Sequence, residues 1–144
     1  MPETIVLARL IPWEINSGSE AVPNWVNIGG LDGAPLPQRE VTRLDDSDND
    51  SAGLETSIPV SERWTAQLTG QMKEDPDTGA RDAGQEACEA AAALGYAGVK
   101  QFRCTSPGGT VKTAKGTCNV QHGSADRNGK IPWTCDIEFR EKPV

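Results

Sequence analysis

The sequence is poor in the residues on which most enzyme active sites depend. It contains a single histidine, His122, and it lacks the GxSxG, GxxxxGK[ST], GxGxxG and HExxH motifs of common hydrolase, nucleotide and metalloprotease sites. A catalytic scheme that needs a histidine would have to rest on His122, and no pair of carboxylates is set apart by its surroundings. These absences predict that the protein is not an enzyme.

Aromatic residues and long apolar runs are also scarce. Four Trp, one Tyr and two Phe are few for a monomeric module that binds sugar through a cluster of exposed rings, and the strand patterns below turn Trp64 and Trp133 inward. No apolar run approaches the roughly 20 residues of a membrane helix. The stretch MPETIVLARLIPW carries Glu3 in place of the basic residues of a secretory signal. We therefore expect neither membrane association nor secretion.

The cysteines do not form a metal-binding pattern. Cys88, Cys104, Cys118 and Cys135 include no CxxC pair, and in a reducing compartment such residues are usually small core side chains. Cys118 and His122 would make half of a zinc site only if Cys104 or Cys135 completed it, and both fall at alternating core positions. The sequence therefore predicts no metal and no cofactor.

The charge is divided unevenly along a chain whose 144 residues suit one domain. The net charge is −7, but residues 1–95 hold 6 Lys and Arg against 17 Asp and Glu, whereas residues 96–144 hold 8 against 4. Specific binding of nucleic acid needs clustered cations without a competing carboxylate field, so this division argues against it. It suits copies that stack head to tail, although a solvated surface with segregated charge explains it equally well.

Alternation of apolar and polar residues is the dominant pattern and predicts antiparallel strands. In RWTAQLTGQMK, residues 64, 66, 68, 70 and 72 form a dry face against Thr65, Gln67, Thr69 and Gln71. The segment IPWTCDIEFRE alternates in the same way from Ile131 to Phe139. Weaker strand patterns occupy residues 4–15, 24–31, 38–44, 54–60, 98–105 and 110–121. The segment SPGGT predicts the turn of a hairpin over residues 98–121.

One segment predicts a helix of about three turns over residues 82–95. Asp82 is the expected N-cap with Gln85 three residues later, and Gly95 is the expected C-terminal cap. The expected apolar face consists of Ala83, Ala87, Cys88, Ala91 and Leu94. We predict a single mainly β domain over residues 1–144, a sandwich or barrel of two packed antiparallel sheets with this one flanking α-helix.

The loop over residues 43–57, RLDDSDNDSAGLETS, is the most unusual segment. Three of its aspartates match the first ligands of an EF-hand, but Ser51 and Ser57 stand where the calcium loop needs Gly and Glu. Weak cation binding stays open. Because an ordered loop of this length is usually functional, we interpret the segment as an acidic loop for interaction with a partner.

The succession WVNIGGLDG, REVTRLDDSDNDSAG, SIPVSERWTAQLTGQM, a helix and IPWTCDIEFRE resembles the major tail tube proteins of tailed bacteriophages over about residues 24–139. The resemblance implies two packed antiparallel sheets with a flanking helix, a fold shared with the tubes of contractile injection systems and type VI secretion. It also implies homohexameric rings that stack into a tube with a continuous β-barrel wall, the conduit for DNA during genome ejection. A tail terminator, a contractile or type VI tube and, less favoured, a monomeric ligand-binding module remain the alternatives.

In that role, particular residues acquire hypothetical tasks. Short uncharged side chains would line the lumen, an acidic loop would reach the neighbouring ring, and basic residues would receive it. The lumen residues are Thr65, Gln67, Thr69 and Gln71. The acidic loop residues are Asp45, Asp46, Asp48 and Asp50. The basic partners are Lys112, Lys115, Arg127 and Lys130. The implied partners are further copies of the chain, the tape measure, tail terminator and baseplate or tip proteins, and a sheath in contractile tails. DNA would pass without specific binding, and the protein would reside in the virion tail after assembly in the host cytoplasm.

Overall fold

The computed structural model describes residues 5, 11–45, 53–54, 57–125, 127 and 129–144. Within these residues the chain forms eight strands, one α-helix and one short 3-10 helix. In chain order they are β1 (Trp13–Asn16), β2 (Trp25–Asn27), β3 (Leu31–Gly33), β4 (Gln38–Asp45), β5 (Ser57–Gln71), α1 (Ala83–Ala93), η3 (Gly95–Ala97), β6 (Lys100–Thr105), β7 (Val111–His122) and β8 (Pro132–Phe139).

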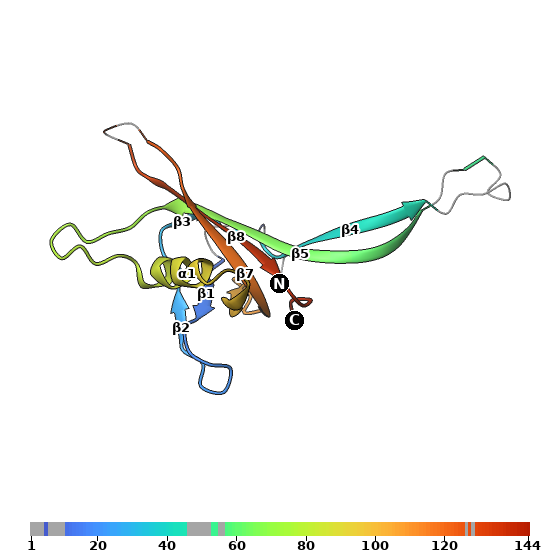
Figure 1. Cartoon of the computed structure of the whole chain (residues 1–144), viewed down its shortest axis with the longest axis horizontal. Coiled ribbons are helices and arrows are strands. Elements are labelled where there is room, and N and C mark those ends of the chain that lie inside the picture. Colours follow the sequence, from blue (N-terminus) through green and yellow to red (C-terminus); the bar gives the residue numbers. More distant parts are fainter. Residues whose placement is uncertain (1–4, 6–10, 46–52, 55–56, 126, 128) are drawn as a thin grey trace.

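The strands form one antiparallel sheet that curls around the helix (Figure 1). The strand order is β2-β1-β6-β7-β8-β5-β3, and β4 also pairs with β5. The predicted mainly β fold with a single flanking α-helix is confirmed. The sheet is continuous where two packed sheets were expected, because each strand from β2 to β3 is hydrogen-bonded to the next and the curl alone encloses the core.

The two strongest strand patterns pair directly with each other. Leu68 lies opposite Cys135 and Gly70 opposite Trp133, so the dry faces of β5 and β8 point to the same side of the sheet. Leu68, Cys135 and Trp133 are fully buried there. This register follows from the pleat, because a slip of one residue would turn every apolar side chain to the opposite face.

The core lies between the curled sheet and α1. Trp13 stacks on Phe139 with ring centroids 6.4 Å apart, and its indole Nε1 donates to the carbonyl of Pro35 at 3.0 Å. Cys88, Cys104 and Cys135 are buried and Cys118 is half-buried, and all four are free thiols. The interpretation of the cysteines as core side chains is therefore confirmed.

Helix α1 begins at the N-cap expected from the sequence. A carboxylate oxygen of Asp82 accepts the backbone N–H of Gln85 at 3.2 Å and that of Gly29 at 2.9 Å. The Gln85 side chain is fully buried and donates to the carbonyls of Gly29 and Gln71, while its oxygen accepts the N–H of Lys73. The start of the helix is thus fixed to the chain between β2 and β3 and to the end of β5.

The buried face of α1 differs from the expected one. Ala83 is exposed and Leu94 is 58% exposed, whereas Gly84 and Gln85 are buried with Cys88 and Ala91. Gly84 lies so close to the chain after β2 that a Cβ atom would stand 2.2 Å from the carbonyl oxygen of Asn27. The prediction is confirmed for Ala87, Cys88 and Ala91 and was wrong for Ala83 and Leu94, because a glycine contact and a hydrogen-bonded glutamine, neither of them apolar, orient the helix toward the sheet.

A two-stranded ribbon projects far from this body (Figure 1). We call it the arm and define it as β4 with residues 57–63 of β5. The strands pair from Gln38 opposite Thr65 to Asp45 opposite Ser57, with a shift of register after Thr42. Strand β8 ends at Phe139, opposite Trp64, so the arm has no other strand beside it among the described residues. No helix within the described residues is long and apolar enough to cross a bilayer.

Candidate functional site

The arm exposes apolar side chains that a small ribbon cannot cover. Leu44 is 57% exposed, Ile58 45% and Val60 55%. Leu44 and Ile58 are directly opposite in the register and so share one face of the ribbon. An isolated two-stranded ribbon is marginally stable in water, and the outer edge of β4 pairs with no other described strand. The arm therefore presents a surface that a partner would complete.

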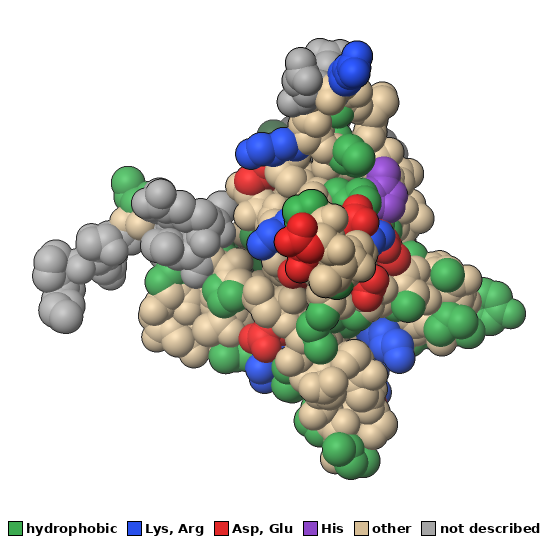
Figure 2. Space-filling model, turned by 90° about the vertical axis from the view of Figure 1, so that its left-hand side faces the viewer, with side chains coloured by type: hydrophobic (Ala, Val, Ile, Leu, Met, Phe, Trp, Pro, Cys, Tyr) green, Lys and Arg blue, Asp and Glu red, His purple; other side chains and the backbone are tan. Residues whose placement is uncertain are grey.

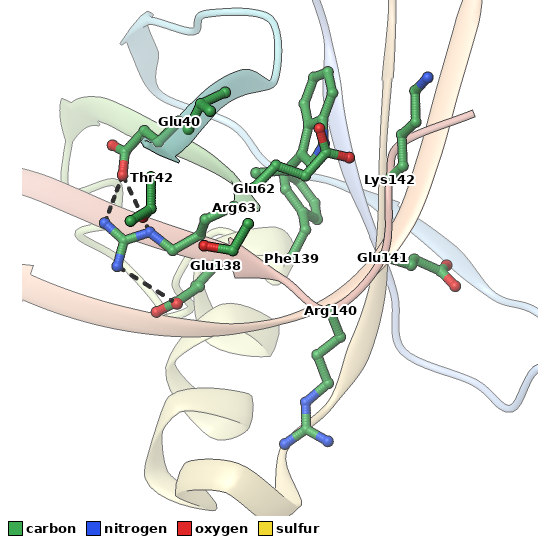
Figure 3. Close-up of a pocket in the computed structure, with 12 residues that line it drawn as sticks. Glu40, Thr42, Glu62, Arg63, Glu138, Phe139, Arg140, Glu141 and Lys142 are labelled. Atoms are coloured by element: carbon green, nitrogen blue, oxygen red, sulfur yellow. Dashed lines mark hydrogen bonds and ion pairs between the residues drawn. The ribbon is translucent and has the colours of Figure 1, made fainter. Parts of the chain in front are cut away.

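Ion pairs mark the base of the arm. Arg39 donates to Glu62 at 2.5 Å. Arg63 contacts Glu40 at 2.6 Å and Glu138 at 3.7 Å (Figure 3). The Arg39 guanidinium lowers the pKa of Glu62, and the Glu40 carboxylate raises the pKa of Arg63. Because these side chains are exposed, water and salt screen the pairs, which fix side-chain positions more than they stabilise the fold.

A groove of about 810 Å³ opens at the same place. It arises because β5 continues outward into the arm, while the chain after β8 stays beside β7. The Arg140 N–H donates to the carbonyl of Lys115 at 2.8 Å, and the Thr113 N–H donates to that of Val144 at 2.8 Å. The divergence leaves the base of the arm on one wall and residues 140–142 on the other.

A polar face covers the side of the sheet away from the core. The side chain of Gln71 donates to Asp32 at 3.2 Å, and Thr69 lies 3.5 Å from the same carboxylate. Asp136 and Glu138 of β8 stand opposite Gln67 and Thr65, respectively. The face therefore carries short uncharged side chains, several carboxylates, and Arg63, which is paired with Glu40 and Glu138.

Comparison with known proteins gives no match to a family model and no match among curated sequences. Several solved structures are similar, among them three tail chains. A chain of the gene transfer agent virion aligns with a TM-score of 0.69 at 10% identity, and one from the tail of the empty particle, with C6 symmetry, at 0.67 and 12%; each alignment covers 96% of both chains. The SPP1 tail tube aligns at 0.64 and 13%, over 96% of this chain and 78% of that one. The chain has the tail tube fold.

In this structure the four proposed lumen residues lie on the polar face just described. Gln67 is exposed, whereas Thr65, Thr69 and Gln71 are half-buried. All four belong to the body part of β5, so the alternation in the sequence was sufficient to group them. Their position in a lumen remains a prediction.

The proposed acidic loop is only partly within the described residues. Asp45 is exposed at the end of β4, at the outer part of the arm, whereas Asp46, Asp48 and Asp50 lie outside the described residues. Contact between these residues and the proposed basic partners remains a prediction.

The four proposed basic residues fall into two groups. Arg127 and Lys130 are exposed in the β7–β8 connection, at the end of the body away from the arm (Figure 1). Lys112 is exposed near the start of β7, and Lys115 already forms an ion pair with Glu20. The four residues therefore do not form one surface, and their role as partners of the acidic loop remains a prediction.

A cluster centred on Glu89 was missed by sequence reasoning. The Glu89 carboxylate accepts from Arg81 at 2.5 Å and from Trp133 Nε1 at 3.3 Å, and His122 Nε2 lies 3.0 Å from it. Burial raises the pKa of Glu89, and the Arg81 guanidinium lowers it. The lowering effects outweigh burial, so the pKa of Glu89 lies below its ordinary value. No local pattern signals this cluster, because its members come from α1, the loop before it, β7 and β8.

Three thiols meet beneath the helix. The Cys118 Sγ lies 3.3 Å from the carbonyl oxygen of Cys88. The neighbouring Cys118 thiol raises the pKa of Cys88 and of Cys135, and burial adds to both shifts. Within the described ranges, no group of three His, Cys, Asp or Glu residues has a metal-binding arrangement. His122, which the zinc pattern grouped with Cys118, lies 3.0 Å from the Glu89 carboxylate.

Proposed function

We propose that the chain is a structural subunit of a phage tail tube, and that copies form six-membered rings that stack into a conduit for DNA. The arm is the observation that carries this proposal. Its apolar residues and its outer edge gain nothing in a lone subunit, whereas a repeated neighbour would cover them. The similarity to tail chains, one of them in a C6-symmetric tail, supports the same role.

Ring closure would come from the two ends of the curled sheet. Strand β2 forms one edge, and β3 and β4 lie at the other. Pairing these edges between identical copies would remove both at once, which is the advantage of a closed barrel over an open sheet. The core and α1 would then lie outside the barrel wall, and the polar face would line the lumen.

The polar face suits a conduit for DNA. Thr65, Gln67, Thr69 and Gln71 are uncharged, and Asp32, Asp136 and Glu138 add carboxylates on the same side of the sheet. The cation on this face beside them, Arg63, is paired with Glu40 and Glu138. With a net charge of −7 on each copy, a ring of six would repel the DNA backbone and let it slide. The tape measure, tail terminator and baseplate proteins would be its other partners in the virion tail.

Negative-stain electron microscopy of the concentrated full-length protein tests the proposal. We expect rings, or tubes of one uniform width. A solution that contains only monomers at high concentration would sink the proposal. A uniform population of single rings that never extend would favour the tail terminator alternative.

A further inference from the structure

Three of the four cysteines lie together beneath α1 and have no part in the proposed assembly. Cys88 lies on the buried face of the helix, Cys118 on β7 and Cys135 on β8. The Cys118 Sγ lies 3.3 Å from the carbonyl oxygen of Cys88, and the thiols of all three residues are hydrogen-bonding neighbours. We call these three residues the thiol cluster. Elements distant in the chain thus bring their sulfur atoms to one place.

The members of the thiol cluster differ in access and in charge. Cys88 and Cys135 are fully buried, whereas Cys118 is half-buried. Hydrogen bonds from the Cys135 and Cys88 thiols stabilise the Cys118 thiolate and lower the pKa of Cys118, although burial opposes this shift. Because the thiolate is the nucleophilic form of cysteine, Cys118 is the member that an oxidant in solution reaches and reacts with first.

The geometry selects Cys88 as the partner of Cys118. Cys118 lies opposite Ile137 in the sheet, and Cys135 lies opposite Val120, so the two cysteines are diagonal neighbours. Diagonal neighbours on paired strands are about 7–8 Å apart. A disulfide spans Cα atoms up to about 7 Å apart, so this pair is poorly placed to form one. Cys88 instead lies above the sheet, with its backbone in contact with the Cys118 sulfur.

The surroundings of the thiol cluster favour a small uncharged oxidant. The Cys118 thiol raises the pKa of Cys88, and the charge of Glu89 adds to this shift. Figure 2 shows acidic side chains at the centre of the end of the molecule away from the arm, where the exposed Glu74, Asp75 and Asp77 precede α1. This field disfavours anionic thiol reagents such as glutathione disulfide. Hydrogen peroxide carries no charge and is small.

We propose that the thiol cluster is an oxidation site, at which hydrogen peroxide joins Cys118 to Cys88 in a disulfide that links β7 to α1. The Cys118 thiolate attacks one peroxide oxygen, the O–O bond breaks, and the departing hydroxide takes up a proton to become water. The Cys88 sulfur then attacks the sulfur of the Cys118 sulfenic acid, so that an S–S bond forms as the S–O bond breaks. The second hydroxide leaves as water with the Cys88 proton. Each sulfur loses one electron, and the peroxide gains both.

The inference does not rest on the proposed assembly, because it concerns a single folded chain. In a reducing compartment the thiols stay free, as they are in this structure. The disulfide closes a loop between Cys88 and Cys118 and restricts the unfolded chain. Oxidation should therefore raise the urea concentration at the unfolding midpoint.

Peptide mapping of the full-length protein in solution tests the site. Each cysteine falls on a separate tryptic peptide, over residues 82–100, 104–112, 116–127 and 131–140. After brief treatment with hydrogen peroxide and alkylation of the remaining thiols, we expect the peptide of Cys88 joined to that of Cys118. Cys104, a buried thiol outside the cluster, is the internal control and should be oxidised at least about tenfold more slowly.

Variants separate the two steps of the reaction. Cys88→Ala should prevent the disulfide and leave Cys118 as a sulfenic acid that dimedone traps. Cys118→Ala should leave Cys88 reduced and abolish the rise in the urea midpoint. The matched control is Cys135→Ala, which alters a residue as buried as Cys88 and should retain the link between Cys88 and Cys118. Circular dichroism checks that each variant remains folded.

Two results with the original protein would overturn the proposal without any variant. One is a disulfide that joins the peptide of Cys135 to either other member in place of the predicted pair. The other is oxidation of Cys104 as fast as that of Cys118, as expected in urea, where the thiols have no fixed arrangement. Glutathione disulfide should form the link at least about tenfold more slowly than peroxide at equal concentration. Equal rates would contradict the preference for an uncharged oxidant.

Discussion

The two halves of β5 have the same alternating pattern and opposite environments. Residues 57–63 are exposed throughout, whereas from Trp64 to Gln71 every second side chain is buried or half-buried against the core. Both halves are hydrogen-bonded strand, so propensity does not separate them. The difference is the covering layer, because α1 and the curled sheet lie over the body half and only β4 accompanies the arm half. The body half of β5 is covered within one chain, whereas the arm half is not.

The strongest test of this contrast compares one core residue with one arm residue on the same strand. Leu68→Ala removes a fully buried side chain, and we expect it to lower the free energy of unfolding by about 2–5 kcal/mol. Val60→Ala in the arm should change it by less than about 0.5 kcal/mol. Urea unfolding of the monomeric protein measures both. Equal losses would mean that the arm is packed in solution.

A second comparison uses buried and exposed glutamines. Gln85→Leu leaves the carbonyls of Gly29 and Gln71 and the N–H of Lys73 without their partner. We expect a loss of about 1–3 kcal/mol in the free energy of unfolding, measured by urea unfolding. The control, Gln67→Leu on the polar face, should stay within about 0.5 kcal/mol of the original protein. A neutral Gln85→Leu would show that helix attachment does not depend on this side chain.

The pH dependence of stability separates the ion pairs of the body from those of the arm. The folded pKa of Glu89 lies below its ordinary value of 4.5, so the stabilisation is complete above about pH 4.5 and is lost as the pH falls through the folded pKa. Arg81→Ala should weaken this acid dependence, measured as the unfolding midpoint between pH 3 and 6. Arg39→Ala should leave it unchanged, because the exposed Glu62 is screened by water. A larger change in acid dependence for Arg39→Ala than for Arg81→Ala would contradict this difference between the body and the arm.

The smallest effect on the isolated subunit should accompany a large effect on assembly. Leu44→Lys with Ile58→Lys places charge on the apolar face of the arm, and we expect monomer stability to change by less than about 0.5 kcal/mol. Tube formation in the electron microscope should be lost. Leu94→Lys with Tyr96→Lys, two exposed positions after α1, is the control that should retain tubes. Tubes in the arm variant would remove the main support for assembly through the arm.

Local patterns predicted the body well because its interactions are repetitive. Alternation placed Leu68, Cys135 and Trp133 on one buried face, and Asp82 was recognisable as a cap because capping is decided within three residues. The Glu89 cluster escaped prediction because four separate elements bring its members together. The groove escaped for a related reason, since it exists only where β5 and the chain after β8 diverge.

The sequence by itself determined the strands, the helix start and the dry and wet faces of the sheet, because a period of two and an N-cap act over a few neighbouring residues. Only the tertiary structure decided that the alternating pattern of β5 continues past the core into an exposed arm. It also decided that a groove opens at the base of the arm, between β5 and the chain after β8. The physical reason is that burial and charge neutralisation depend on segments distant in the chain, which the local pattern does not specify.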